Sequence, residues 1–429
     1  MAASQGIRTA IVLAAGEGTR LRPITFTRPK PLIPILGKPF ISHILENLSK
    51  AGIRRAIVVI GYRGEEIRKY LEENSKKLGL KIDFVTQARA LGTGHAFAAA
   101  AGLLAKSDER FLCLAGDNYY SAGDIADFVK KAEKEAGFLV GGIDVLDPGR
   151  FGIFSLEGER VTKVIEKPAN PPSNTANASL YLFDKSCLDL AGKLEKSPRG
   201  EYEITDVLKI LAGRNLLNFS RLSYWTDLGA PWDILDLNAK LLSEMKGKIH
   251  SGAEIERGAH IKGAVLIGKG TIVKSGSYIE GPVWIGEDCS IGPNCYIRAG
   301  TVLGEKTGVG QAVEIKNSVF FGHTNVKHLS YVADSVIGKN CNFGAGTITA
   351  NLRHDKGNIK MVLNGKLVDS GRRKLGVVMG DNSKTGIHCS VYPGRTIGPN
   401  SWTDSASLVD RDVPPGHFLR RDGTIEKLP

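Results

Sequence analysis

The sequence has no CxxC pair of cysteines and no long apolar run. Its six cysteines are scattered through a chain of 429 residues, which is large enough to fold without disulfide bonds, so we expect reduced thiols. No apolar stretch reaches the roughly 18 residues that suggest a membrane span, and a short polar lead, Met1–Gly6, runs directly into a strand-like segment. We therefore expect a soluble, cytoplasmic protein without a membrane partner.

Two further absences narrow the choice of ligands. No arginine-rich run alternates with aromatic residues, so the net charge of +12 does not indicate nucleic acid. The glycine-rich turn near the N-terminus lacks the Gly-Lys-Ser/Thr of the phosphate loop and the third glycine of the dinucleotide fingerprint. The basic charge is compatible with small anions such as nucleotides, sugar phosphates or coenzyme A.

The length predicts two domains, because one hydrophobic core stops growing at roughly 250 to 300 residues. Residues 1–230 alternate short β-branched runs with helical stretches, which predicts an α/β, Rossmann-like domain with a mainly parallel sheet. Strands are expected at Thr9–Ala14, Ala56–Ile60, Ile82–Thr86, Phe111–Ala115 and Phe138–Ile143. Helices are expected at Phe40–Ala51, Glu65–Leu78, Gly94–Ala105 and Asp124–Ala136. Residues 231–248 form a linker, with a leucine-rich helix at Trp232–Met245.

A six-residue repeat occupies residues 249–429. From Ile249 to Ile315 every sixth residue is aliphatic, Phe321 continues the series, and glycine often follows, which is the hexapeptide signature of a left-handed parallel β-helix. Equivalent aliphatic residues stack coil upon coil in such a solenoid. The repeat breaks after Phe321 and again across Asn351–Lys374, and it resumes from Met379. We expect the breaks to mark functional positions.

A glycine-rich turn follows the first expected strand. It reads Leu13-Ala14-Ala15-Gly16-Glu17-Gly18-Thr19-Arg20-Leu21, and Pro29-Lys30-Pro31 comes shortly after it. Backbone N–H groups at Gly16 and Gly18 can approach a triphosphate closely, and Arg20 and Lys30 can neutralise its charge. The turn therefore predicts a nucleotide site with two cations.

The same turn resembles the signature of the sugar-phosphate nucleotidylyltransferases, and the resemblance covers about half the chain. It continues in order through Gln87, Leu91-Gly92-Thr93-Gly94, Gly116-Asp117-Asn118, Gly152, Glu166-Lys167, Asn177 and Asp227. The resemblance implies that Gln87 contacts a pyrimidine base. It implies nucleotide binding by Leu13, Ala14, Ala15, Gly16, Gly18, Thr19, Gly92 and Thr93. It implies sugar binding by Asp117, Gly152, Glu166, Lys167, Asn177 and Thr205.

Two carboxylates follow strand-like runs, Asp117 after Phe111–Ala115 and Asp227 after Leu222–Thr226. Ligands bind at the carboxyl ends of parallel strands, and two carboxylates can hold one Mg²⁺. The implied reaction is attack by a sugar phosphate oxygen on the α-phosphorus of a nucleoside triphosphate, with release of pyrophosphate. Because both reactants are anions, catalysis would consist of alignment and neutralisation by Mg²⁺, Arg20 and Lys30.

A second set of motifs lies around the first break in the repeat: Glu314-Ile315-Lys316-Asn317, His328-Leu329-Ser330-Tyr331 and Asn342-Phe343-Gly344. It resembles the acetyltransferase domain of bifunctional N-acetylglucosamine-1-phosphate uridylyltransferases. The resemblance implies that His328 is the catalytic base, since an imidazole can take a proton from a sugar amine near neutral pH. It implies acetyl-acceptor binding by Arg298, Lys316, Tyr331, Asn342 and Asn351, and acetyl-CoA binding at Gly386 and Ala406.

We therefore expect an enzyme that acetylates glucosamine-1-phosphate with acetyl-CoA and couples N-acetylglucosamine-1-phosphate to a uridylyl group with Mg²⁺. The resemblance also implies a homotrimer. The motif Arg28-Pro29-Lys30-Pro31-Leu32 is similar to that of glucose-1-phosphate thymidylyltransferases, so UTP and dTTP both remain open. The alternatives are a thymidylyl- or uridylyltransferase whose β-helix is not catalytic, and a regulatory subunit without activity. Retention of Arg20, Lys30, Asp117 and Asp227 argues against the last.

Overall fold

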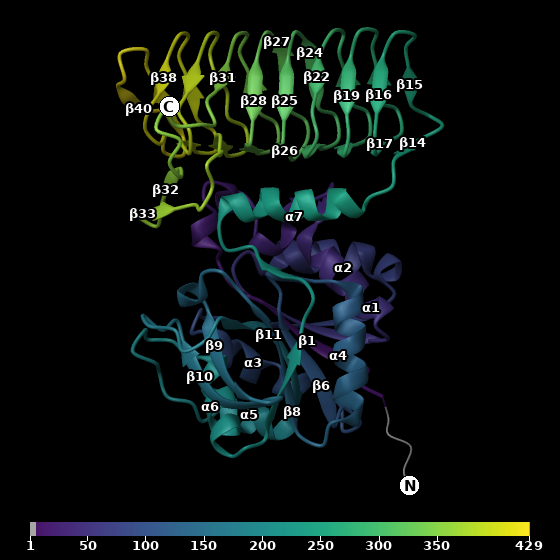
Figure 1. Cartoon of the computed structure of the whole chain (residues 1–429), viewed down its shortest axis with the longest axis vertical. Helices are drawn as coiled ribbons and strands as arrows, with labels where there is room; N and C mark the ends of the chain where they lie inside the picture. Colours follow the sequence, from purple (N-terminus) through teal and green to yellow (C-terminus); the bar gives the residue numbers. More distant parts are fainter. Residues whose placement is uncertain (1–5, 429) are drawn as a thin grey trace. The chain divides into compact units, whose positions relative to one another are not determined.

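A computed structural model describes residues 6–428, and the chain folds into two compact units (Figure 1). The α/β unit comprises the residues up to Glu17, Pro29–Leu32 and Phe40–Asp227. The β-helix unit comprises Gly18–Arg28, Ile33–Pro39 and the chain from Leu228 onward. Two short segments from the N-terminal signature therefore pack with the β-helix unit.

The α/β unit is built on a nine-stranded sheet with the order β5-β4-β1-β6-β11-β8-β12-β10-β9. Its strands are β1 (Thr9–Ala14), β4 (Arg55–Ile60), β5 (Lys81–Thr86), β6 (Arg110–Ala115), β8 (Phe138–Asp144), β9 (Gly152–Glu157), β10 (Arg160–Glu166), β11 (Thr175–Asp184) and β12 (Leu217–Arg221). The five expected strands are confirmed to within one residue at each end. Strands β5, β4, β1 and β6 are parallel, but β11 runs antiparallel to both β6 and β8, so the sheet is mixed rather than mainly parallel.

The helices of this unit carry apolar side chains that are buried against the sheet. They are α1 (Phe40–Lys50), α2 (Gly64–Leu78), α3 (Thr93–Ala99), α4 (Ala122–Lys134), α5 (Lys185–Ala191) and α6 (Ile204–Gly213). The helix expected at Gly94–Ala105 ends at Ala99, and a 3-10 turn at Ala101–Leu103 follows it. The expected linker helix is α7 (Pro231–Glu244), which groups with the β-helix unit.

A two-stranded ribbon joins two distant parts of the α/β unit. Strand β7 (Asn118–Tyr120) pairs antiparallel with β13 (Trp225–Asp227), so that Asp227 lies opposite Asn118. The strand expected at Leu222–Thr226 is thus only the short β13, outside the main sheet. The ribbon nevertheless brings Asp227 beside the end of β6, where Asp117 lies.

Three parallel sheets of short strands form the β-helix. The first contains β14 (Lys248–Ile249), β17 (Val265–Ile267), β20 (Val283–Ile285), β23 (Thr301–Leu303), β26 (Val319–Phe320), β29 (Val336–Ile337), β34 (Val378–Met379) and β36 (Thr396–Ile397). The second contains β15 (Glu254–Ile255), β18 (Ile272–Val273), β21 (Ser290–Ile291), β24 (Gly308–Gln311), β27 (Asn325–His328) and β30 (Asn342–Phe343). The third contains β16 (His260–Lys262), β19 (Tyr278–Glu280), β22 (Tyr296–Ile297), β25 (Glu314–Lys316), β28 (Tyr331–Ala333), β31 (Ile348–Thr349), β35 (Ser390–Val391) and β38 (Leu408–Val409).

This architecture is the expected left-handed β-helix, and the repeated aliphatic residues from Val265 onward form one continuous buried core. The assignment of Phe321 to the repeat was wrong, because Phe320 pairs with Leu303 and occupies the core position. The coil is one residue shorter there, so stacking continues without a break through Val326 and Val332. His328 therefore ends a regular strand and is not lifted off the coil.

The second expected break, at Asn351–Lys374, contains an inserted hairpin. Its strands are β32 (Lys360–Leu363) and β33 (Lys366–Asp369), which pair antiparallel. The insertion leaves after β31 and returns before β34, which stacks on β29 as the next coil. The amide of Leu375 donates to the carbonyl of Asn351 at 3.0 Å, so the two ends of the insertion lie together.

The last coils carry a different ending. Strand β39 (His417–Leu419) stacks in parallel on β37 (Trp402–Thr403), and β40 (Ile425–Lys427) folds back antiparallel against β39.

All six cysteines are buried free thiols, as expected. No helix of residues 6–428 is both long and apolar enough to cross a membrane.

Candidate functional site

A cavity of about 300 Å³ opens at the carboxyl end of β1 in the α/β unit. Seven residues that the sequence predicts for the nucleotide or sugar line it: Leu13, Ala15, Gly16, Gln87, Gly92, Thr93 and Asp117. A methyl group at Gly16 would meet no heavy atom within 4 Å, so the backbone there faces open space. Such a backbone can approach a ligand closely.

Gln87 and the Gly-Thr-Gly turn form one side of this cavity. The buried Gln87 amide donates to the carbonyl of Gly92 at 3.0 Å and lies 3.0 Å from a ring nitrogen of His95. Gly92 has φ 103°, and a methyl group there would lie 2.5 Å from the carbonyl oxygen of Tyr202. Only glycine fits this position. The Thr93 hydroxyl accepts the amide of Ile204 and so connects the turn to α6.

The rest of the signature turn leads into the β-helix unit. Ala14 ends β1, and Gly18 adopts φ 69° at the start of a 3-10 turn, Thr19–Leu21. Arg20 is exposed within that turn. The Thr25 hydroxyl donates to the carbonyl of Gly18 at 2.8 Å, which closes the segment on itself.

Lys30 lies between the two candidate metal ligands. Its ammonium is 2.6 Å from Asp117 Oδ2 and 3.5 Å from Asp227 Oδ1, and its side chain is 7% exposed. The sequence-predicted pair of carboxylates therefore converges on one point. No group of three or more His, Cys, Asp or Glu side chains that could hold a metal occurs among the described residues. A metal here would take its remaining ligands from substrate or water.

Three of the predicted sugar-binding residues surround a fourth, Gly152. A methyl group at Gly152 would lie 3.0 Å from Glu166 Oε2, 3.6 Å from Asn177 Cβ and 3.7 Å from Thr205 Cγ2. The Asn177 amide donates to the Tyr181 hydroxyl at 2.9 Å, which fixes its orientation. The Thr205 hydroxyl is buried and has no hydrogen-bond partner. An unpaired buried hydroxyl is a suitable contact for a ligand.

Sequence inspection missed a charged network beside these residues. Arg199 lies 3.3 Å from both Glu166 and Glu203, and Lys167 lies 3.7 Å from Glu166. Burial raises the pKa of the Glu203 carboxyl. The sequence did contain an indication of this network. The charged run Arg199-Gly200-Glu201-Tyr202-Glu203 directly precedes α6 and lies next to Thr205.

The second candidate site lies on the third sheet of the β-helix. Arg298 pairs with Glu314 at 2.8 Å, and Glu314 lies opposite Tyr331 in the neighbouring coil. Burial raises the pKa of the half-buried Tyr331 hydroxyl. Burial lowers the pKa of the Lys316 ammonium, and the nearby cation Lys374 lowers it further. Asp334 is also close to this ammonium and raises its pKa, so the cations share the site with a carboxylate.

Asn351 and Lys374 reach this site from the two ends of the insertion. The Asn351 amide donates to Asp334 at 2.5 Å, and Leu352 bridges to Lys374. Lys374 was not among the predicted site residues. The only indication of a role for Lys374 in the sequence was its position at the end of the insertion, where the hexapeptide repeat resumes.

His328 and Asn342 lie apart within one chain. Both are exposed on the second sheet, but Asn342 pairs with Asn325, at the opposite end of β27 from His328. The carbonyl of His328 accepts the amide of Gly346 and the hydroxyl of Ser330, which fixes the corner that leads to Tyr331. His328 is therefore near Tyr331 along the chain, whereas Asn342 lies opposite Asn325, three residues before His328.

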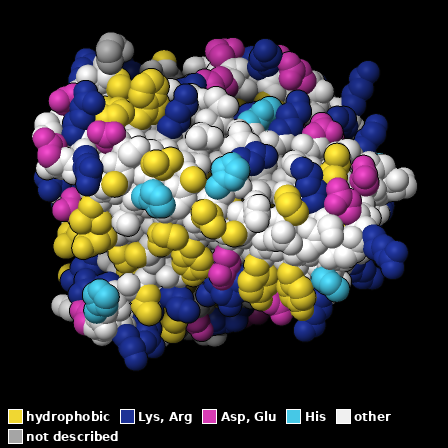
Figure 2. All heavy atoms as spheres, turned by 90° about the horizontal axis from the view of Figure 1, so that it is seen from above, with side chains coloured by type: hydrophobic (Ala, Val, Ile, Leu, Met, Phe, Trp, Pro, Cys, Tyr) yellow, Lys and Arg dark blue, Asp and Glu magenta, His cyan; other side chains and the backbone are white. Residues whose placement is uncertain are grey.

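The two residues predicted for acetyl-CoA lie in successive coils but not opposite each other, because the backbone at Gly386 lies against Asp404. The amide of Ala406 donates to the carbonyl of Ile387 at 2.7 Å, directly after Gly386. Figure 2 shows one face on which hydrophobic and histidine side chains gather, with lysine and arginine around them. The large hydrophobic side chains exposed on the β-helix include Tyr278, Leu329, Ile348, Ile387, Tyr392 and Leu408.

Residues 9–244 match the nucleotidyl transferase family, which fits the cavity and the Lys30 cluster. The chain belongs to this family. Residues 279–392 match the GMPPB C-terminal domain. The α/β unit is also similar to a crystal structure from Bacillus anthracis, described as a candidate glucose-1-phosphate thymidylyltransferase in complex with a sucrose. That match has a TM-score of 0.51 and 28% identity and covers 54% of this chain and 94% of the other.

The relatives that match along nearly the whole chain are bifunctional. "Bifunctional protein GlmU" from Methanocaldococcus jannaschii is 42% identical over 97% of this chain and 98% of its own length. The "Bifunctional sugar-1-phosphate nucleotidylyltransferase/acetyltransferase" of Sulfurisphaera tokodaii is 39% identical over 96% and 99%. Within the family, the chain is thus a homologue of the archaeal nucleotidyltransferase/acetyltransferases, as the sequence motifs implied.

Proposed function

We propose that the protein makes UDP-N-acetylglucosamine in two steps. The β-helix transfers an acetyl group from acetyl-CoA to glucosamine-1-phosphate, and the α/β unit couples the product to the uridylyl group of UTP and releases pyrophosphate. One observation carries the proposal: polar and charged side chains gather in both units. In the α/β unit they lie around Lys30 and around Gly152, and on the β-helix they lie around Arg298, Lys316 and Lys374.

In nucleotidylyl transfer the residues of the α/β unit position two anions. Gln87 and the Gly92-Thr93 turn hold the base and ribose, and Gly16 gives the phosphates room to approach the backbone. Gly152, Glu166, Asn177 and Thr205 hold the sugar hydroxyls, and Lys167 neutralises its phosphate. The sugar phosphate oxygen then attacks the α-phosphorus, while Arg20 and Lys30 stabilise the leaving pyrophosphate.

Asp117 and Asp227 are the proposed ligands of Mg²⁺. Their oxygen atoms suit a hard cation, and both already face one positive charge, the Lys30 ammonium. When bound, Mg²⁺ would neutralise phosphate oxygens and align them for in-line displacement. Asp117 and Asp227 would hold that charge in one place, because Asp227 ends β13 and Asp117 directly precedes β7, the strand paired with it.

In acetyl transfer the cations Arg298, Lys316 and Lys374 hold the phosphate of the acceptor sugar, and Tyr331 and Asn351 orient it. His328 takes a proton from the sugar amine, the amine nitrogen attacks the thioester carbonyl, and the thiolate of coenzyme A leaves. Gly386 and Ala406 contact the coenzyme. A homotrimer would cover exposed residues such as Leu329 and Ile387.

A second candidate function is glucose-1-phosphate thymidylyl or uridylyl transfer with a β-helix that has no catalytic role. The similarity of the α/β unit to the Bacillus anthracis protein and the match of residues 279–392 to the GMPPB C-terminal domain favour it. The cations Arg298, Lys316 and Lys374 argue against it, because together with the carboxylates of Glu314 and Asp334 they leave a net positive charge on the third sheet, which suits an anionic ligand.

Two assays on the full chain test the proposal. The first follows release of the coenzyme A thiol from acetyl-CoA with glucosamine-1-phosphate. The second follows pyrophosphate release with each pairing of UTP or dTTP with N-acetylglucosamine-1-phosphate or glucose-1-phosphate, with and without Mg²⁺. Both activities are expected. Pyrophosphate release without thiol release would support the second candidate function. Absence of both activities would refute both candidate functions.

A further inference from the structure

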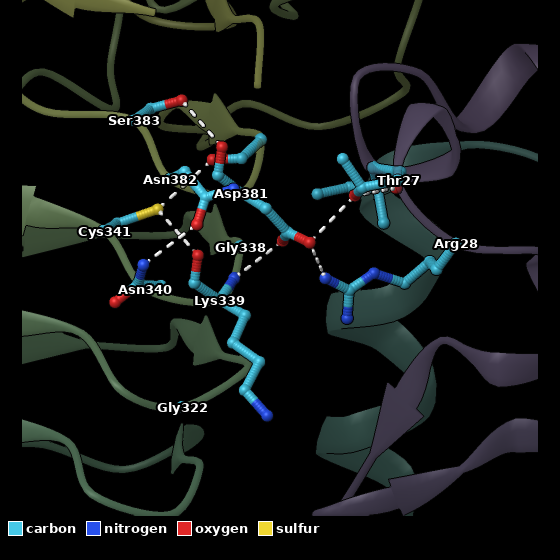
Figure 3. A network of polar contacts seen from close by, with 12 residues as sticks. Thr27, Arg28, Gly322, Gly338, Lys339, Asn340, Cys341, Asp381, Asn382 and Ser383 are labelled. Carbon is cyan, nitrogen blue, oxygen red and sulfur yellow. Dashed lines mark hydrogen bonds and ion pairs between the residues drawn. The ribbon is translucent and has the colours of Figure 1, made fainter. Parts of the chain in front are cut away.

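A carboxylate is built into one corner of the β-helix (Figure 3). Asp381 follows β34, and its Oδ1 accepts the amide of Lys339 at 2.7 Å from the preceding coil. A methyl group at Gly338 would lie 2.6 Å from the same oxygen, so only glycine leaves room for the carboxylate. The corner thus fixes the Asp381 side chain through neighbouring coils.

The other oxygen of Asp381 binds the N-terminal signature segment, Gly18–Arg28. The Thr27 hydroxyl donates to Oδ2 at 2.8 Å, and the Arg28 guanidinium forms an ion pair with it (Figure 3). The two charged side chains are only 13% and 14% exposed. The guanidinium also lies over the ring of Phe321, 4.8 Å from its centroid. A paired charge with so little access to water is held firmly, because breaking the pair leaves the other charge buried.

The inserted hairpin holds the other end of the same segment. Asn364, in the turn between β32 and β33, donates its amide to the Thr19 hydroxyl at 2.9 Å. Thr19 opens the 3-10 turn that contains Arg20. The segment is therefore bonded to the β-helix next to Arg20 and again at Thr27 and Arg28, eight residues later.

We propose that Asp381 and Asn364 are positioning residues for nucleotidylyl transfer, acting from the β-helix through the signature segment. The inference rests on the proposed role of Arg20 and Thr19 at the triphosphate. Without these two attachments the segment would become ordered only when the nucleotide binds. The free-energy cost of that ordering would weaken nucleotide binding, and Arg20 would be positioned less accurately. The insertion at Asn351–Lys374 then serves both reactions: Lys374 faces the acetyl acceptor and Asn364 holds the nucleotide segment.

The test compares full-length variants. Asp381→Asn keeps an oxygen for the Lys339 amide but loses the charge that Arg28 pairs with, and Asn364→Ala removes the bond to Thr19. Asp369→Asn is the matched control, because its carboxylate also accepts a backbone amide, that of Gly371, within the same hairpin. Lys366→Ala controls for the change in the hairpin turn, since Lys366 is exposed.

We expect kcat/KM for pyrophosphate release to fall about tenfold to a hundredfold in Asp381→Asn, the loss that misplacement of a positioned group causes. The KM for the nucleotide should rise more than the KM for the sugar phosphate. Amide hydrogen exchange of residues 18–28 should accelerate, and the unfolding temperature should fall because Arg28 is left unpaired, whereas acetyl transfer measured well below that temperature should stay near wild type. In the double variant Asp381→Asn, Arg28→Gln, the loss of kcat/KM should be no larger than the product of the losses in the two single variants.

Two results would overturn the inference. One is faster exchange in residues 18–28 with unchanged nucleotide kinetics, which would make the attachment irrelevant to catalysis. The other is a loss of acetyl transfer as large as the loss of pyrophosphate release, which would make Asp381 structural. If the wild-type chain releases no pyrophosphate with any tested pair of substrates, the proposed function fails instead, and that outcome is visible before any variant is made.

Discussion

The ammonium of Lys30 lies 2.6 Å from the carboxylate of Asp117, and the side chain of Lys30 is only 7% exposed. Asp227 approaches the same ammonium from the ribbon formed by β7 and β13. The single positive charge of Lys30 thus faces two carboxylates and offsets only one of their two negative charges. Binding of a metal and a triphosphate would require Lys30 to exchange carboxylate partners for phosphate oxygens.

The first prediction follows from this cluster. Replacing Asp227 by Asn should lower nucleotidylyl transfer by at least about a hundredfold, because a fixed charge at the reacting phosphate is lost. The Mg²⁺ concentration needed for half-maximal activity should rise. Asp189→Asn, an exposed carboxylate on α5, is the control and should behave as wild type. Near-normal pyrophosphate release by Asp227→Asn would show that this residue holds no metal.

The second prediction concerns the space above Gly152. Gly152→Ala places a methyl group 3.0 Å from Glu166, where the sugar is proposed to bind, so the KM for the sugar phosphate should rise roughly tenfold or more. The KM for the nucleotide should not change. Gly149→Ala is the control, since its nearest neighbour would be 3.7 Å away. Equal changes in both KM values would mean that the substitution disturbs the sheet and not the sugar site.

The third prediction separates the two activities. His328→Ala should lower acetyl transfer by about a hundredfold to ten-thousandfold, which is the usual contribution of a general base. Nucleotidylyl transfer should stay the same, because His328 lies on the β-helix. His260→Ala, another exposed histidine of the β-helix, serves as the control. Retention of more than about a tenth of the acetyl-transfer rate would assign His328 to binding or to structure.

The fourth prediction concerns the buried thiols. Burial raises the pKa of Cys289 from 9.0 to about 11 and that of Cys341 to about 12. At pH 8 only about one Cys289 side chain in a thousand is a thiolate, so the folded protein should not react with a disulfide reagent. All six cysteines should react after unfolding.

The same pKa shifts give the sign of a pH effect on stability. Unfolding releases these thiols to ionise near pH 9, so the unfolded chain binds fewer protons than the folded chain above that pH. The free energy of unfolding should therefore fall as the pH rises from about 9 to about 11. Denaturant titrations at pH 8, 9.5 and 10.5 would measure it, and a flat profile would contradict the assignment.

Most of the β-helix could be predicted because its core repeats every six residues and each repeat packs in the same way. The prediction failed at Phe320, where a coil loses one residue and the neighbouring phenylalanine, Phe321, also fits the pattern. In the α/β unit, β11 was not expected, although it lies at the centre of the sheet. Antiparallel insertion of a strand between β6 and β8 depends on tertiary pairing that no local periodicity records.

The residues of the candidate sites were likewise predicted only in part. Motifs identified Gly152, Glu166, Asn177 and Thr205, and the fold brings these four together from β9, β10, β11 and α6. Arg199 and Lys374 were missed because each acts through neighbours that are distant in sequence. The attachment of Thr27 and Arg28 to Asp381 spans more than 350 residues, and only a three-dimensional structure could reveal it.

The antiparallel return of β40 onto β39 covers one edge of the last coil. A stack of parallel coils would otherwise present unpaired backbone groups at its last turn, and another solenoid could dock there and extend it into a fibre. Because β40 occupies that edge with a strand running the opposite way, the next coil in a parallel series has no matching surface. Strand β40 thereby covers one parallel edge to which a further coil could otherwise add.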